Sequence, residues 1–485
     1  MRQTAESISG QRSSVAALWE KNTVVMCLVA VILLVHAGML GYSATLHSPT
    51  VNEPGHLVAG LTHWRFGQFN VYRVNPPLVH YVSAIPVMLA GYEEDWSDYS
   101  ELPAARPEYR MGTAFVKANG NRSAWLITLA RWACIPFSLL GGLFCFRWSR
   151  ELWGNSVSGL VSLTAWCFEP MVLAHGELIT SDCAAASLGV GAGYMFWRWL
   201  DRPTWRRALA AGLVMGLAEL TKTSWVILFV LWPLLSVVWL FMNRHRKSSN
   251  SFFRSLRQVG FILIVAIYVL NLGYGFDGSM TRLNEFTFVS RTLTGRDKAG
   301  IPGNRFKESE IGRLPVPVPA SYLSGIDVQK MDFERFTKPS YLRGEWRDGG
   351  WWYYYIYGLT IKTTLSLQCL ILLSFFTSVY LYRSCADKNR RAETAAPPPT
   401  EGSERHALNC DPPDSPAMPP DFRRARMCDL VVLWAPAIVI MMLVSSQLEF
   451  NQHVRYVLPA LGFAIVSAGG AAWWFVPATP DRSAR

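Results

Sequence analysis

Long apolar runs constrain this 485-residue chain more than any other feature of its sequence. A helix that crosses a bilayer needs about 20 mostly apolar residues. Segments of this kind lie at residues 23–46, 123–147, 156–174, 179–199, 208–221, 223–242, 259–275, 363–382, 429–447 and 455–476. Only 17% of the residues are charged, whereas soluble domains carry about 25%. The sequence therefore predicts an all-α, polytopic membrane protein with about ten transmembrane helices.

The formal net charge of +11 would suggest nucleic-acid binding in a soluble protein. In this chain the basic residues lie beside apolar runs, where they hold loops on the cytoplasmic side of a membrane, so no nucleic-acid partner is expected. If the N-terminus is cytoplasmic, alternation of ten helices places every short basic loop on that same side. These loops lie at residues 147–150, 198–207, 244–247, 383–391 and 423–426. Both termini are therefore expected in the cytoplasm.

Two long segments then fall on the outer side, at residues 47–122 and 276–352. The first contains an expected short helix at 55–66 and an apolar stretch at 77–92, whose two prolines favour an interfacial over a spanning position. The second is polar and rich in glycine and proline. An aromatic cluster at 351–357 follows it, as is typical of the headgroup level.

The expected domain organisation follows from these spans. Residues 384–427 are rich in Pro, Ala, Asp and Arg, which predicts a disordered cytoplasmic linker. The chain then divides into a cytoplasmic N-terminus at 1–22, a transmembrane module at 23–275 that includes the outer loop 47–122, an outer segment at 276–352, a transmembrane helix at 353–383, the linker, and a C-terminal transmembrane hairpin at 428–485.

An acidic residue opens the first outer segment, within residues 52–56 (NEPGH). At the membrane surface Glu53 would be partly desolvated and could act as a general base toward a hydroxyl group. The alternative is structural, since Asn52 and Glu53 precede a proline as residues at a helix start do. Further along, Arg73 could reach a headgroup phosphate, or it could simply extend its side chain toward the membrane surface.

Three more carboxylates lie in the hairpin between the third and fourth expected helices: Glu169, Glu177 and Asp182. A charged residue inside a membrane helix must face the bundle or a wet cavity. The helix dipole alone would also favour Asp182 near a helix start, which is the structural alternative. Acidic groups from two separate outer turns predict that Glu53 and Asp182 share one pocket.

Four groups that carry or can acquire positive charge lie at expected outer helix ends: Lys222, Lys362, His453 and Arg455. Cations on that side run against the usual distribution of positive charge, which favours an anionic partner. Lys222 could instead pair with Glu219 on the same helix, and the others could contact lipid headgroups.

Several short motifs occur in a fixed order along the chain. They are Asn52-Glu53, Asn75-Pro76-Pro77-Leu78, Ala174-His175-Gly176, Thr180-Ser181-Asp182, Gly216-Leu217-Ala218, Thr221-Lys222 and Arg455-Tyr456-Val457-Leu458-Pro459. The set resembles the polytopic lipid-phosphate-sugar glycosyltransferases of the GT-C class, in particular the branch of the protein O-mannosyltransferases and aminoarabinose transferases. The order agrees across residues 23–242 and more loosely to 476. The family usually has Asp-Glu in its first loop, so only Glu53 matches that acidic pair.

The resemblance implies a GT-C-like fold and transfer of a sugar from a polyprenyl-phosphate donor to an acceptor hydroxyl, with inversion at the anomeric carbon. It implies that Glu53 is the general base and that Asp182 orients the acceptor or the base. It also implies a set of substrate-binding side chains: Asn52, His56, Arg73, His175, Lys222, Lys362, His453 and Arg455. Some members of the class use a divalent metal, for which this sequence indicates no ligand set. Whether the acceptor is a protein, a lipid or a glycan stays open.

Two other functions are compatible with the sequence. One is a transporter or flippase of a lipid-linked substrate, although such proteins usually show internal repeats and charges near the middle of the bilayer. The other is a non-catalytic relative that binds a polyprenyl lipid, which the presence of Asn52 keeps open. Short loops and outer segments without cysteine favour a bacterial inner membrane, with the active site on the periplasmic face.

Overall fold

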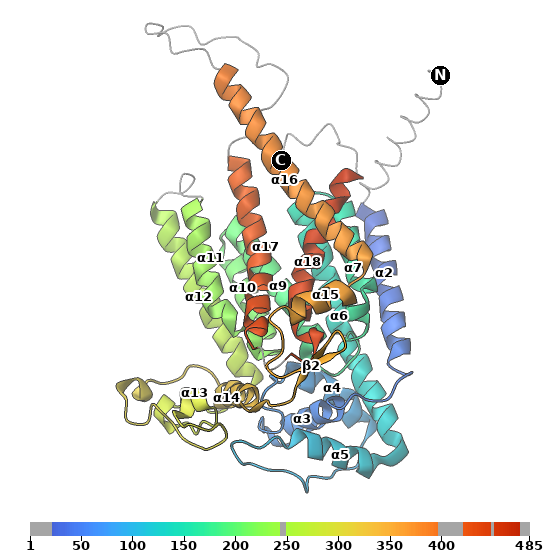
Figure 1. Ribbon diagram of the computed structural model, residues 1–485, viewed down its shortest axis with the longest axis vertical. Helices are drawn as coiled ribbons and strands as arrows, with labels where there is room; N and C mark the ends of the chain where they lie inside the picture. Colours follow the sequence, from blue (N-terminus) through green and yellow to red (C-terminus); the bar gives the residue numbers. More distant parts are fainter. Residues whose placement is uncertain (1–21, 243–248, 396–420, 448–450, 476–485) are drawn as a thin grey trace.

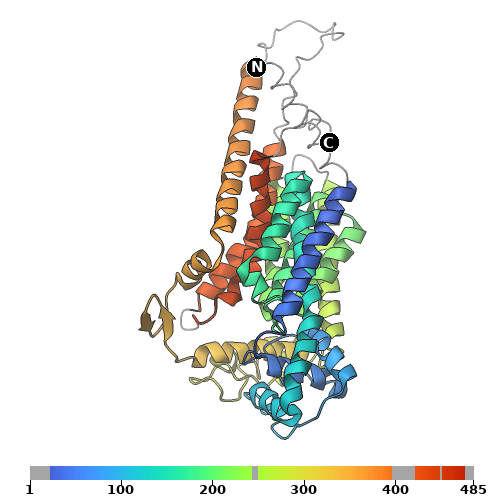
Figure 2. The same cartoon turned by 90° about the vertical axis from the view of Figure 1, so that its right-hand side faces the viewer.

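The computed structural model describes residues 22–242, 249–395, 421–447 and 451–475. Long helices run side by side as a bundle, and shorter helices collect at one end of it, the lower end in Figures 1 and 2. The bundle helices are α2 (Asn22–Ser43), α6 (Ser123–Trp153), α7 (Ser156–Phe168), α9 (Ser181–Asp201), α10 (Trp205–Glu219), α11 (Leu228–Met242), α12 (Ser249–Gly273), α16 (Leu365–Ala395), α17 (Asp421–Ser445) and α18 (Leu458–Ala468).

The shorter elements fill the predicted outer segments and the turns at that end. The helices are α3 (Glu53–Phe66), α4 (Leu78–Ala90), α5 (Glu108–Asn119), α8 (Pro170–Leu173), α13 (Arg291–Thr294), α14 (Ala320–Arg335) and α15 (Tyr354–Lys362), and the only strands among the described residues are β1 (Ser340–Leu342) and β2 (Glu345–Arg347), paired antiparallel. Single 3-10 turns are η1 (Gly120–Arg122), η2 (Thr223–Ile227), η4 (Leu283–Glu285), η5 (Glu310–Arg313), η7 (Val454–Val457) and η8 (Gly469–Trp474).

The all-α, multi-pass architecture predicted from the sequence is confirmed. Each of the ten predicted spans coincides with a helix, including the hairpin of α10 and α11. By length and composition, six helices of the described chain can cross a membrane, or seven if the bent pair of α15 and α16 forms one span. Helices α7 and α10 have only 13 and 15 residues, so the count of ten stays a prediction.

Two helices extend into the predicted linker at 384–427, which itself stays a prediction. Helix α16 continues to Ala395, and α17 begins at Asp421. Residues 384–395 include Ala, Lys, Arg and Glu, which are good helix formers and can extend a helix beyond its apolar part. The middle of the linker, the N-terminal residues 1–21 and the C-terminal residues 476–485 lie outside the described residues.

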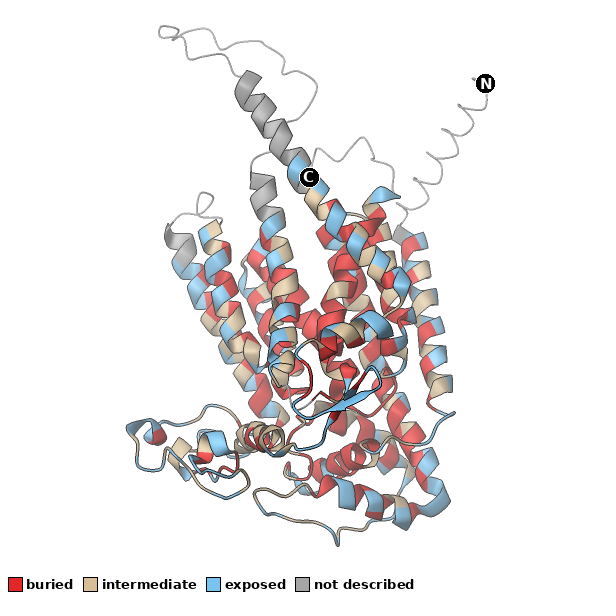
Figure 3. Ribbon diagram, in the orientation of Figure 1, coloured by how far each residue is buried: buried red, intermediate tan, exposed pale blue. Residues whose placement is uncertain are grey.

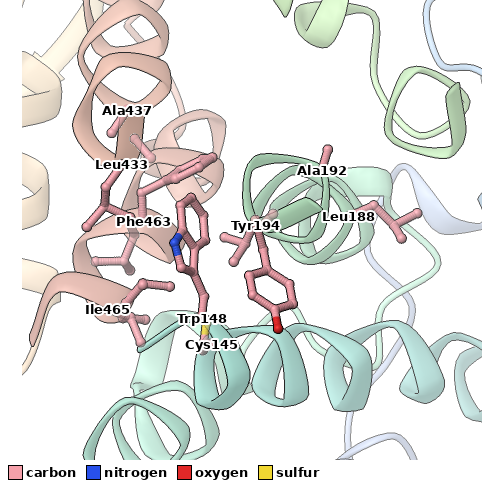
Figure 4. Packing of buried hydrophobic residues seen from close by; sticks show 14 of the residues in the cluster. Cys145, Trp148, Leu188, Ala192, Tyr194, Leu433, Ala437, Phe463 and Ile465 are labelled. Atoms are coloured by element: carbon pink, nitrogen blue, oxygen red, sulfur yellow. The ribbon is translucent and has the colours of Figure 1, made fainter. Parts of the chain in front are cut away.

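Helix α9 forms the centre of the bundle and is buried along most of its length (Figure 3). Its small residues let neighbouring helices approach closely. At Gly189 a β-carbon would lie 1.8 Å from the Trp225 ring, so only glycine fits there. Figure 4 shows Tyr194 of α9 beside Trp148 of α6, which in turn packs edge-on against Phe463 of α18. This packing holds the middle of α9, and Asp182 lies in the first turn of the same helix.

The outer segments are held against the end of the bundle by specific hydrogen bonds. The backbone N–H of Leu78 donates to the carbonyl of Leu220 at 3.0 Å. In the second segment, the hydroxyl of Tyr322 on α14 donates to the buried carboxylate of Glu219 at 2.8 Å. The neighbouring Thr223 hydroxyl lies 2.8 Å from the Gln329 side-chain oxygen. Both outer segments therefore meet the same turn, the one between α10 and η2.

Candidate functional site

The site centres on Asp182, in the first turn of α9. Lys222 Nζ lies 2.6 Å from Asp182 Oδ1, and Arg455 Nε lies 3.5 Å from Asp182 Oδ2. The three residues come from α9, the turn after α10, and η7, so the fold brings together groups that are distant in the sequence. Lys222 pairs with Asp182 rather than with Glu219, whose carboxylate accepts the Tyr322 hydrogen bond instead. The alternative interpretation of Lys222 as a helical salt bridge is therefore wrong.

Positive charge exceeds negative charge in this cluster. One carboxylate faces two cations, and Arg455 Nε has no hydrogen-bond partner. Lys222 Nζ and the Arg455 guanidinium also lie over the Tyr456 ring, 5.3 Å and 5.8 Å from its centroid. Lys362, at the end of α15, is exposed and has no carboxylate within 4 Å in the part of the chain that the structure describes. Such an arrangement is suited to binding a phosphate group.

Two histidines complete the rim of this cluster. His175 is half-buried and its Nδ1 atom has no hydrogen-bond partner. Burial lowers the pKa of His175, while Asp182 acts in the opposite direction. Burial also lowers the pKa of His453, and the adjacent Arg455 lowers it further. Both imidazoles therefore favour the neutral form, in which one ring nitrogen can accept a hydrogen bond.

Glu53 lies at the same end of the bundle but in different surroundings. It is fully buried, and Arg131 of α6 donates to both of its oxygens, at 2.7 Å and 2.8 Å. The backbone N–H groups of Thr50 and Ile179 donate to it as well, at 2.7 Å and 3.5 Å. A carboxylate has about four lone-pair positions, so this set of donors occupies them. The role of Glu53 as general base stays a prediction. Both oxygens of its carboxylate already accept hydrogen bonds, so neither is free to accept a proton from a substrate.

Two other residues of the first outer segment, Asn52 and Arg73, were also predicted to bind substrate. Asn52 is the N-cap of α3 and makes no side-chain capping hydrogen bond. The Arg73 guanidinium donates to the carbonyls of Asn70, Pro103 and Glu101 at 3.1, 3.1 and 3.4 Å. These bonds hold the loop after α4 in place, and the expected contact of Arg73 with phosphate stays a prediction.

His56 lies one turn after Glu53 on α3, where its ring packs against Tyr72 and His80. Asp182, Arg455 and Arg106 all act electrostatically on its ring. Its exposed fraction is only 3%, and its ring centroid lies 4.2 Å from that of Tyr72. His56 is therefore buried within the electrostatic range of the Asp182 cluster.

Some residues of this region were not predicted from the sequence. Arg131 could have been found, because a charged residue inside the apolar run 123–147 requires a buried partner. Arg106 joins the two outer segments by binding Glu108 at 2.6 Å and also Asp332. No signal in the sequence indicates that pairing, since its partners lie in polar segments without clear periodicity.

The described residues contain no group of three or more His, Cys, Asp or Glu side chains that could hold a metal ion. Asp182 is already engaged by two cations, and Glu53 by Arg131. These carboxylates therefore do not fit a divalent metal in this arrangement, and no step of the chemistry is assigned to one.

No protein-family model matches the sequence, and no curated protein sequence is similar to it. Solved structures show a loose likeness over most of the chain. The Archaeoglobus fulgidus oligosaccharyltransferase in the apo form has 11% identity and a TM-score of 0.45. The match covers 94% of the present chain and 51% of the oligosaccharyltransferase chain. AglB from the same organism, in complex with an inhibitory peptide and a dolichol-phosphate, has 11% identity, a TM-score of 0.49 and the same coverage.

ArnT from Cupriavidus metallidurans bound to undecaprenyl phosphate has 14% identity and a TM-score of 0.35. The match covers 93% of the present chain and 78% of the ArnT chain. The present chain spans about half the length of the two oligosaccharyltransferase chains. At these identities and TM-scores, the likeness does not transfer the role of any residue to this chain.

Proposed function

We propose that this protein is a membrane glycosyltransferase that moves a sugar from a polyprenyl-phosphate donor to an acceptor hydroxyl. The observation that carries the proposal is the cluster of Asp182, Lys222 and Arg455, which gathers surplus positive charge at the end of an apolar helical bundle. A lipid tail can lie against the bundle while its phosphate reaches these cations. We place this end on the periplasmic face of a bacterial inner membrane, with both termini in the cytoplasm.

The chemistry is a single displacement with inversion. The acceptor oxygen attacks the anomeric carbon, and the bond from that carbon to the phosphate oxygen breaks. Negative charge grows on the leaving phosphate, where Lys222 and Arg455 stabilise it, and preorganised cations of this kind act most strongly away from water. Asp182 holds both cations in position before the donor binds. Lys362 and His453, at the rim, are available to the sugar or the outer phosphate oxygens.

The test is donor turnover by the purified protein in lipid. A radiolabelled polyprenyl-phosphate sugar is supplied, and loss of label from the organic phase is followed for the wild type, Lys222→Ala, and Lys338→Ala. Lys338 is an exposed lysine of the second outer segment and serves as the matched control. The proposal expects turnover in the wild type and the control, and strongly reduced turnover in Lys222→Ala.

Two results would contradict the proposal. Absence of turnover with any sugar donor would leave the protein as a lipid-binding one. Movement of intact lipid between leaflets, without loss of the sugar, would instead indicate a flippase.

A further inference from the structure

Three buried histidines form a continuous hydrogen-bonded row in the first outer segment. His56 and His63 lie seven residues apart on the same face of α3, and His80 projects between them from α4. His56 Nδ1 is 2.8 Å from His80 Nε2, and His80 Nδ1 is 3.2 Å from His63 Nε2. The row ends at the backbone, where His63 Nδ1 lies 2.6 Å from the carbonyl oxygen of Gln68.

All three rings are neutral at pH 7, because burial removes the water that would stabilise an imidazolium. Burial lowers the pKa of His56 to about 3 and that of His63 to about 4. The pKa of His80 falls well below its usual value, for the same reason and because two other histidines flank it. A neutral imidazole has one N–H donor and one acceptor nitrogen, so each ring in the row must choose between two tautomers.

The carbonyl of Gln68 determines that choice for the whole row. A carbonyl only accepts hydrogen bonds, so His63 Nδ1 must carry the proton and His63 Nε2 must be the acceptor. His80 Nδ1 therefore donates to His63, and His80 Nε2 accepts from His56 Nδ1. The opposite order would set an unprotonated His63 nitrogen against the carbonyl oxygen. The consequence is that His56 Nε2 is left as an unprotonated nitrogen.

This nitrogen has no hydrogen-bond partner among the described residues. The ring that carries it is under the electrostatic influence of Asp182 and Arg455, and it contacts Tyr72. An unprotonated lone pair within the electrostatic range of Asp182 and Arg455 can receive a proton from a bound hydroxyl group. Glu53, by contrast, has its lone pairs occupied by Arg131 and two backbone groups.

We propose that His56 is the general base of the transfer reaction and that His80 and His63 are positioning residues that fix its tautomer. This inference rests on the proposed glycosyltransferase function. The proton of the acceptor hydroxyl moves to His56 Nε2 as the acceptor oxygen bonds to the anomeric carbon. The electron pair of the broken bond leaves with the lipid phosphate.

The row can also move the new positive charge away from the cations of the site. His56 can pass its Nδ1 proton to His80, which can pass its own to His63, where the Gln68 carbonyl stabilises the imidazolium. The hops reverse when the departing lipid phosphate takes up the proton. No other proton donor or acceptor is needed, and all three rings return to their starting tautomers.

The row is tested directly by nitrogen NMR of the full chain in lipid nanodiscs, with ¹⁵N-labelled histidine. The chain has nine histidines, and loss of signals in His56→Gln, His80→Gln and His63→Gln assigns the three of interest. At pH 7 we expect all three to be neutral and protonated at Nδ1. In His63→Phe, His56 and His80 should no longer be protonated only at Nδ1. In His47→Gln, a change outside the row, the protonation of all three rings should stay the same. A wild-type His56 protonated at Nε2 would overturn the proposal.

Activity supplies the second readout. His56→Gln should lower kcat by at least about 100-fold while the KM for the donor changes little. His63→Phe should lower kcat about tenfold, and His63→Gln, whose amide oxygen can still accept from His80, should restore most of it. If His56→Gln keeps the kcat of the wild type, His56 is not the general base, but the proposed function is unaffected. A wild type without any turnover would overturn the proposed function, and the NMR result would still decide the order of the row.

Discussion

Two buried carboxylates lie at the same end of the helical bundle, and their surroundings differ. Glu53 forms a bidentate ion pair with one arginine, Arg131, and backbone N–H groups donate to its remaining lone pairs. Asp182 faces two cations, and its single negative charge neutralises only one of them. More positive charge lies nearby at the exposed Lys362. The comparison shows that burial and a charged partner do not by themselves indicate function. An excess of one charge is the more informative feature.

The largest expected effect concerns the stability provided by the Glu53–Arg131 pair. In Glu53→Gln, the Arg131 guanidinium loses its counter-charge while buried, which should lower the free energy of unfolding by about 3–5 kcal/mol. Glu53→Leu/Arg131→Met should recover part of that loss, but not all, because Arg131 also binds the carbonyls of Ala44 and His47. Chemical denaturation in detergent measures both.

The exposed pair of Glu310 and Arg313 is the control for that experiment, since Glu310→Gln should change stability by less than about 1 kcal/mol. If Glu53→Gln instead keeps full stability but loses all turnover, and the double variant does not regain it, Glu53 is the base after all. The difference between the two carboxylates would then disappear.

The second effect concerns the cations of the Asp182 cluster. Lys222→Ala should lower kcat by about 10²–10³-fold, the usual consequence of removing one preorganised group that stabilises developing negative charge. Lys222→Arg should retain part of the activity because it keeps the charge. Steady-state turnover of a labelled donor gives the comparison, and an unchanged kcat in Lys222→Ala would remove this lysine from the chemistry.

The third effect separates binding from turnover at Asp182. Asp182→Asn removes the carboxylate that competes with a phosphate for Lys222 and Arg455. The affinity for a polyprenyl phosphate should therefore be at least that of the wild type. Turnover should fall by up to about 10²-fold, because the cations lose the group that positions them. Loss of phosphate binding in Asp182→Asn would mean that the carboxylate contacts the ligand in some other way.

The smallest effect is a pH dependence of stability in the row of His56, His80 and His63. The pKa values of His56 and His63 are lowered to about 3 and 4 in the folded protein, whereas in the unfolded chain they are near 6.5. Unfolding therefore takes up protons below pH 6.5, and the folded state loses stability as the pH falls from there. By pH 5 the loss is about 2 kcal/mol for each histidine.

Thermal unfolding at pH 7.5 and pH 5 tests this expectation. The groups that face His56 include Asp182, Arg455, Arg106, Tyr72 and His80, and they remain in His63→Phe. That variant should thus lose about 2 kcal/mol less than the wild type between the two pH values. Equal losses in the two proteins would contradict neutral buried rings.

Much of the fold could be predicted from the sequence because apolar run length and basic loops constrain a membrane protein strongly. The turn at Lys222 was needed for consistent alternation, and the structure has a break there between α10 and η2. The grouping of Asp182, Lys222 and Arg455 at one end followed from the same argument. Helices α5 and α14 were missed, since their polar segments lack a clear apolar period.

Partner identity could not be predicted. Glu53 and Arg131 are 78 positions apart, and nothing in either local sequence specifies the other. The same holds for the row of histidines, since the spacing of His56 and His63 on one helix is visible in the sequence but the insertion of His80 depends on how α4 packs. Tertiary packing therefore decides which charges are structural and which are available to a ligand.

The most direct measurement is a structure of the protein in lipid with a polyprenyl phosphate bound. We predict that the phosphate group lies within hydrogen-bond distance of Lys222 and Arg455, on the side of Lys362, with the Glu53–Arg131 pair intact. A phosphate bound elsewhere, with Lys222 and Arg455 still engaged only by Asp182, would contradict the account.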